Sequence, residues 1–269
     1  MIRDVGGLHM PTTIDNVGLA PEDPLKMPPP YWRSVGAIFH VLSALGDLSG
    51  LLARLIPLHR ETSGPLDEYF SQHPEAEEDD AELEEFGAIC SDLVELEHRI
   101  RLRAELAIFM SAIDAEDTLN RFCIYNLHRD IAESLEKLSP PEKLRVASAV
   151  VGHPGVAGRD PYAALKRLSA WRNAFAHGHP VDRPTKSLRH SHLVSPPEYP
   201  GVPDTIATMV ELLNGYLRIC RYLESISLNS YTASGSVEAE EIEDHLSDIT
   251  KYQFECEGST TVYTVRFVG

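Results

Sequence analysis

The sequence predicts an all-α protein with a small C-terminal β-hairpin. Over most of the chain, apolar residues recur at intervals of three and four, which is the spacing of one stripe on a helix face. Near the end of the chain, apolar and polar residues alternate on both sides of Gly258 and Ser259, as in two strands joined by a turn. The 269 residues, 43% of them hydrophobic, are enough to bury one large core.

Composition and periodicity divide the chain into four segments. The first is rich in proline and has no periodicity, whereas the last combines an acidic run with the alternating pattern. We expect a proline-rich irregular arm (1–32), an N-terminal helix with an acidic loop (33–82), a helical bundle (83–228), and an acidic linker followed by the hairpin (229–269).

The N-terminal helix and the loop after it differ sharply in composition. Apolar residues keep helical spacing after Ser34, which is a favourable N-cap, and Pro57 is expected to end the helix. The acidic run at 75–85 holds eight acids and no base. Repulsion among these charges predicts that the run is flexible at its start and helical only from about Ala81.

The predicted bundle begins with its longest helical stretch. Apolar spacing runs from Leu83 to Ile113 and continues to Leu138, either in the same helix or after a kink near Asp114. The later helices begin at favourable caps, which are Ser139 in a capping box with Glu142, Asp160 followed by Pro161, and Asp204.

The charge distribution is uneven. A net charge of −17 argues against a nucleic-acid partner, but 14 of the 41 acids lie in the runs 75–85 and 238–248. Between residues 140 and 195 there are nine Lys or Arg residues against three acids, a local charge of +6. A basic region therefore lies inside an acidic protein.

Several patterns limit the location and the cofactors. The first twenty residues carry no apolar run, and the longest apolar stretch, 35–58, is interrupted by Asp47 and Arg54. The four cysteines have no paired spacing, which is typical of reduced thiols. We expect a cytoplasmic protein with no membrane partner, no cofactor and no metal site.

The helix that begins at Asp160 carries the residues best suited to catalysis or binding. Its packing stripe is expected to consist of Leu165, Leu168, Trp171 and Phe175, with a stop at Gly178. Arg172, Asn173 and His177 lie off that stripe near the C-terminal end. Asn173 and His177 are four residues apart and hence neighbours, while Arg172 reaches back with its long side chain.

This segment resembles the HEPN superfamily, whose mark is an Arg, four to six residues and then a His, often with a polar residue directly after the Arg. The surrounding sequence is similar too. It contains Ala115-Glu116-Asp117-x-Leu119-Asn120 in the preceding long helix and Leu138-Ser139-Pro140-x-x-Lys143-Leu144 in the connection. The similarity covers roughly residues 83–228 and leaves the arm, the first helix and the hairpin without a counterpart.

The resemblance implies a HEPN-like helical bundle that forms a homodimer and cleaves RNA without a metal, as a toxin or defence ribonuclease. His177 would act as general base or acid, Arg172 would hold the phosphate, and Asn173 would orient either of them. Glu116 or Asp117 is expected to position His177. The candidate supporting residues are Glu116, Asp117, Asn120 and His179, and the candidate RNA contacts are Lys166, Arg167, Arg183, Lys186 and Arg189.

Other functions remain open at this stage. Arg, Asn and His at a helix C-terminus also serve as caps, so a noncatalytic HEPN-like module that binds a nucleotide or a protein partner is the alternative. An antitoxin or another regulatory protein is an expected partner of a toxin. The four histidines at 177, 179, 190 and 192 could bind zinc, but their spacing is unlike the strong zinc patterns.

Overall fold

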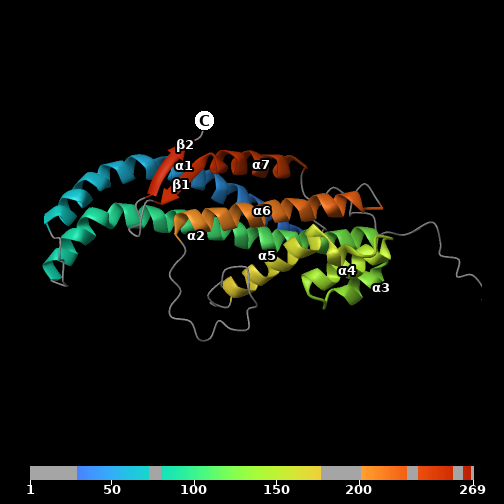
Figure 1. Cartoon of the computed structure of the whole chain (residues 1–269). Helices are drawn as coiled ribbons and strands as arrows, with labels where there is room; N and C mark the ends of the chain where they lie inside the picture. The colour runs from blue at the N-terminus through green and yellow to red at the C-terminus, as the bar shows by residue number, and fades with distance from the viewer. Residues whose placement is uncertain (1–28, 73–79, 177–200, 229–235, 257–262, 268–269) are drawn as a thin grey trace, which may run out of the picture.

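The computed structural model describes residues 29–72, 80–176, 201–228, 236–256 and 263–267, and these residues are predominantly α-helical, as the sequence predicts. Residues 1–28 of the proline-rich arm and the start of the acidic run lie outside the described residues. The last four residues of the expected arm, 29–32, are instead helical, because α1 begins at Pro29 and not after the expected N-cap Ser34. Figure 1 shows three layers, with α1 and α7 on one side of α2 and α6, and with α3, α4 and α5 on the other.

Two long helices, α1 (Pro29–Gln72) and α2 (Asp80–Asn126), run side by side and make the largest helix contact in the described chain. Leu45, Leu48 and Leu52 of α1 are fully buried, as are Ile100 and Ile108 of α2. These residues belong to one continuous core that also includes α5, α6 and α7. The N-terminal helix is therefore part of the bundle and not an addition to it.

The expected end of the first helix at Pro57 is wrong, because α1 continues through Pro57 and Pro65 to Gln72. An interior proline removes one backbone hydrogen bond and costs about 3 kcal/mol. Pro57 is exposed, while Leu55 is fully buried and Tyr69 is 7% exposed. Burial on either side of the proline offsets its cost, and the chain stays helical as far as Gln72.

Of the two alternatives at Asp114, the structure shows one continuous helix, because α2 runs without a break to Asn126. It does not reach Leu138. A separate short helix, α3 (Arg129–Leu135), follows, with His128 as its N-cap. The Nδ1 atom of His128 accepts a hydrogen bond from the backbone N–H of Asp130 at 3.4 Å.

The connection to the motif helix consists of α4 (Pro140–Val150), a short 3-10 turn η2 (Val156–Gly158) and then α5 (Asp160–Ala176). Ser139 is the N-cap of α4, as predicted, but its hydroxyl donates to the Glu142 carboxylate at 2.7 Å instead of accepting from a backbone amide. Gly155 has a φ of 89°, a conformation that favours glycine, where the chain turns into η2.

The helix α6 (Val202–Ser225) packs against both α2 and α5. Gly215 allows the close approach of α5, since a Cβ atom placed there would lie 3.1 Å from the Cβ of Ala164. The stretch expected to be an acidic linker instead forms α7 (Ser236–Thr250). Ile242, Leu246 and Ile249 recur at helical spacing and are buried in the common core, which provides the burial that a solvated linker lacks.

Two short strands, β1 (Tyr252–Cys256) and β2 (Tyr263–Phe267), pair in antiparallel fashion near α1, with Tyr252 opposite Phe267 and Cys256 opposite Tyr263. The predicted turn at Gly258 and Ser259 lies outside the described residues.

Among the described residues, one segment, Gly36–Thr62 of α1, is long and apolar enough to cross a membrane by length and composition. Its most apolar face is buried against α2 and α7, and its Asp47 forms an ion pair with Arg103 of α2 at 3.2 Å. Cellular location stays a prediction.

A buried polar network joins α2 to α6. The Oδ2 atom of Asp114 accepts hydrogen bonds from the Tyr216 hydroxyl at 2.6 Å and from the Thr118 hydroxyl at 3.3 Å. Arg121 donates to the Thr118 oxygen at 2.9 Å. Burial raises the pKa of Asp114 to about 6, despite the opposing effects of the Tyr216 hydrogen bond and the Arg121 charge.

This network predicts a pH-dependent stability. The pKa of Asp114 is about 6 in the folded chain against an ordinary value of 3.8, so the folded state holds the proton more tightly. Its contribution to the free energy of unfolding is therefore lost as pH rises from about 4 to above 6, by roughly 3 kcal/mol. Asp114→Asn should remove this part of the pH dependence of the free energy of unfolding, which urea unfolding at pH 4 and pH 7.5 measures. The same change with pH in Asp114→Asn and the wild type would contradict the prediction.

Candidate functional site

The C-terminal part of α5 brings the motif against α2. Leu165 and Leu168 are buried and fix one face of α5 in the core, which leaves Arg172 half-buried and Asn173 exposed. Figure 1 shows α5 crossing obliquely beneath α2 and α6. The two polar residues thus lie at the edge of the α2 and α5 contact.

Arg172 forms an ion pair with Glu116 of α2. Its Nη1 atom donates to Glu116 Oε2, and the two side chains are 24% and 29% exposed. Glu116 or Asp117 was expected to position His177, which lies outside the described residues; within them, Glu116 pairs with the arginine of the motif. The pairing joins residues 56 positions apart and ties α5 to α2.

Asn173 contacts the other edge of the same guanidinium. Its Oδ1 atom accepts from Arg172 Nε at 3.3 Å and from Nη2 at 3.1 Å. The Nε and Nη2 pair is the edge with which arginine binds two oxygens of a carboxylate or phosphate. Here one exposed, neutral amide oxygen occupies it.

Another candidate on α2, Asn120, lies one turn after Glu116. Asn120 Oδ1 accepts from Nζ of Lys143 at 2.5 Å, which links the two segments that carry the family resemblance outside the motif. Lys143 is 3% exposed, and burial lowers its pKa, with the charge of Asp117 among the opposing effects. These residues anchor α4 on α2.

The packing stripe predicted for α5 is correct for Leu165 and Leu168 but wrong for Phe175, which is 41% exposed. Phe175 lies at the end of the helix, beyond the buried part of the contact with α2. Its ring stacks on Trp171, with centroids 5.5 Å apart and planes 15° apart, and it also meets Phe109 of α2 at 5.1 Å. We call these three rings the aromatic cluster.

The candidate RNA contacts on α5 differ in availability. Lys166 is exposed, whereas Arg167 forms an ion pair with Glu211 of α6. Together with the ion pair of Arg172 and Glu116, this pairing neutralises part of the charge of the basic stretch. The remaining candidates, His177, His179, Arg183, Lys186 and Arg189, lie outside the described residues, as do His190 and His192.

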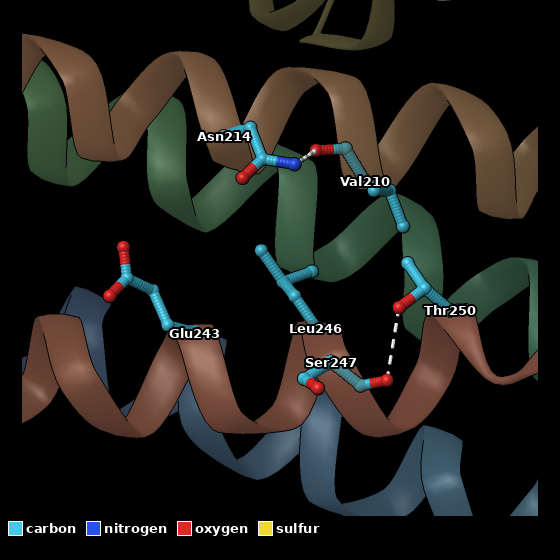
Figure 2. Close-up of a pocket in the computed structure, with 6 residues that line it drawn as sticks. All are labelled: Val210, Asn214, Glu243, Leu246, Ser247 and Thr250. Atoms are coloured by element: carbon cyan, nitrogen blue, oxygen red, sulfur yellow. Dashed lines mark hydrogen bonds between the residues drawn. The ribbon is translucent and has the colours of Figure 1, made fainter. Parts of the chain in front are cut away.

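Other places in the described chain offer less chemistry. No group of three or more His, Cys, Asp or Glu residues in this part of the chain could hold a metal ion. Figure 2 shows a shallow pocket between α6 and α7. Its Asn214 amide donates to the Val210 carbonyl and its Thr250 hydroxyl donates to the Ser247 carbonyl, so these polar groups are satisfied within their own helices.

No protein-family model matches the chain, and comparisons with curated proteins and with solved structures gave no match.

Sequence reasoning missed two contributors to the site region. It did not foresee the Asp114 and Tyr216 bond, although an acid inside the apolar stripe of a long helix is a detectable signal. It also placed Phe175 in the core. Phe175 lies near the helix end, two residues before the motif histidine, and this position was a sign that its ring could be exposed.

The Glu116 and Arg172 pair should contribute measurably to stability. Both side chains are mostly buried, so a double-mutant cycle with Glu116→Ala and Arg172→Ala should give a coupling energy of about 1–2 kcal/mol, above the range of exposed pairs. Urea unfolding of the four proteins measures it.

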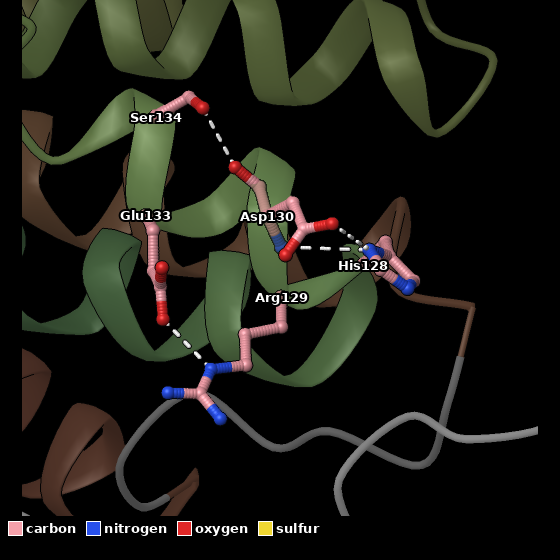
Figure 3. Close-up of polar contacts among 5 residues, drawn as sticks. All are labelled: His128, Arg129, Asp130, Glu133 and Ser134. Carbon is pink, nitrogen blue, oxygen red and sulfur yellow. Dashed lines mark hydrogen bonds and ion pairs between the residues drawn. The ribbon is translucent and has the colours of Figure 1, made fainter.

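The matched control is Arg129 with Glu133 on α3, which Figure 3 shows alongside His128 and Asp130. This pair has the same residue types at 2.7 Å, but its side chains are 86% and 60% exposed. Its cycle should give a much smaller coupling energy. Equal couplings in the two cycles would show that the motif arginine is not fixed to α2.

Proposed function

We propose that the protein is a metal-independent endoribonuclease of the toxin or defence type, built on a HEPN-like bundle, in which Arg172 and His177 act on RNA. One observation carries the proposal. The guanidinium of Arg172 is held at the edge of the bundle by Glu116 and Asn173, and Arg172 precedes His177 by five residues in the sequence.

The arrangement suits phosphate binding. Glu116 holds Nη1 and orients the guanidinium, while the Nε and Nη2 edge meets only the Asn173 amide oxygen. A phosphate brings two oxygens and negative charge to that edge, and charge-assisted bonds are roughly twice as strong as neutral ones. A phosphodiester should therefore displace the amide oxygen, which is then free to orient another group.

The reaction follows from these residue types. His177 takes the proton from a ribose 2′-hydroxyl, and the 2′-oxygen attacks the adjacent phosphorus. The bond from phosphorus to the 5′-oxygen breaks, and that oxygen takes a proton from the acid form of a second His177 or from water. Arg172 stabilises the charge that develops on the phosphate oxygens. The products carry 2′,3′-cyclic phosphate and 5′-hydroxyl ends.

The alternative is a noncatalytic module of the same fold that binds a nucleotide or a protein partner. The pairing of Arg172 with Glu116 and of Arg167 with Glu211 favours it, because both acids reduce the positive potential of α5. The two functions differ in a simple assay, since only the nuclease changes the length of RNA.

Arg172→Ala and His177→Ala should each reduce RNA cleavage by at least about a hundredfold, because a general base and a donor to developing charge each contribute about 10²–10³ or more in rate. Cleavage of pooled tRNA and mRNA at pH 6–8 should persist in EDTA and weaken as salt rises.

The controls are Arg129→Ala on α3 and His98→Ala on α2, 18 residues before Glu116, and both side chains are exposed. Both should cleave like the wild type. Intact RNA in every pool, or full activity of His177→Ala, would refute the nuclease and favour the noncatalytic binding module.

The active form is a two-fold homodimer in this proposal, because one Arg and one His make a sparse phosphate site and a second copy supplies further donors. Light scattering at micromolar concentration should give twice the mass of 29.9 kDa. A monomer at that concentration would contradict the paired site while leaving the fold unaffected.

A further inference from the structure

The aromatic cluster has more exposed ring surface than core packing requires. Trp171 and Phe109 are half-buried, whereas Phe175, which contacts both of these rings, is 41% exposed. The adjacent Ala174 is 4% exposed, whereas Asn173 and Ala176 are exposed like Phe175, so only one side of the helix end is buried.

The cluster lies next to the guanidinium. Phe175 follows Arg172 by three residues, which places the two side chains as neighbours on the helix surface. On α2, Phe109 and Glu116 are seven residues apart and share a face in the same way. Each helix thus contributes aromatic side chains and one charged residue, and the rings of the two helices meet as their charges do.

We propose that the Phe175 ring, backed by Trp171, stacks on an unpaired nucleobase of single-stranded RNA whose phosphate meets Arg172. The inference rests on the proposed function and specifies its substrate class. A ring face accepts any base, so the preference is for unpaired RNA and not for one sequence. Bases within a duplex are already stacked on both sides and cannot use the ring.

The size and the surroundings of the patch favour a base over a protein surface. One exposed ring beside the charged Arg172 is far below the roughly 800 Å² that each partner of a stable protein interface buries. The other large exposed apolar side chains of the described chain lie on other helices or on the turn after α6. A ring next to a cation can stack on a base while the cation binds the phosphate next to that base.

The test separates binding from cleavage. The probe is a 2′-O-methyl RNA 12-mer, which lacks the nucleophilic hydroxyl, together with the same 12-mer with abasic positions and its duplex form. Because the chain has two tryptophans, a Trp32→Phe background makes Trp171 the sole tryptophan reporter. The variants are Phe175→Ala, Phe175→Tyr, which keeps a ring, and Phe39→Ala as the matched control on α1, where Phe39 is 59% exposed.

The expected result is quenching of Trp171 fluorescence by the single strand and not by the abasic or duplex forms. Phe175→Ala should weaken single-strand binding by about 5- to 150-fold, the range of one base stack, while Phe175→Tyr restores it and Phe39→Ala leaves it unchanged. Circular dichroism shows whether each variant is folded.

Equal binding by Phe175→Ala and the wild type, or equal binding of the abasic strand, overturns the stacking role, as does a wild type that binds no RNA. A change in oligomeric mass with unchanged RNA binding also overturns it and assigns the rings to contact between copies. The nuclease is judged separately on unmodified RNA. Stacking without cleavage supports this inference and refutes the nuclease, whereas cleavage without any effect of Phe175 does the reverse.

Discussion

The fold depends on burying α2 on several sides at once. This 47-residue helix contacts α1 along one side, α6 and α5 along others, and α4 near its C-terminal part. A helix with apolar residues on more than one face is unstable in water until neighbours cover it. The order of the layers follows, because α1 and α7 cover one side and the motif helix must pack on another.

Polar groups inside this apolar contact fix how α6 lies on α2. The Asp114 carboxylate meets the Tyr216 hydroxyl near the middle of the contact, and Asn126 accepts from the Ser227 hydroxyl and the Leu228 amide near its end. Sliding α6 by one turn would leave these buried groups unpaired, at a cost of about 1–3 kcal/mol each. Apolar packing supplies most of the stability, and the polar bonds select one register.

Sequence spacing predicted the helices well because each long helix buries a stripe in one core. It failed where a local signal was outweighed by tertiary contact. Pro57 did not end α1, and the acids at 238–248 did not prevent α7, since buried leucines and isoleucines on the same helices offset both effects. At the site, the positions of Arg172 and Asn173 at the helix end could be predicted. The choice of Glu116 as partner could not, because it depends on how α5 crosses α2 and brings together residues 56 positions apart in the sequence.

The pairing that positions Arg172 also limits what it can bind. Glu116 neutralises part of the guanidinium charge, so a single weak anion gains little by approaching it, and the net charge of −17 repels anions at long range. A ligand must therefore add a second favourable contact to the one with the guanidinium. The neighbouring Phe175 ring supplies such a contact only to a ligand with a flat, unstacked group close to its phosphate. Requiring both contacts would discriminate unpaired RNA from duplexes and from free phosphate without a strongly basic surface.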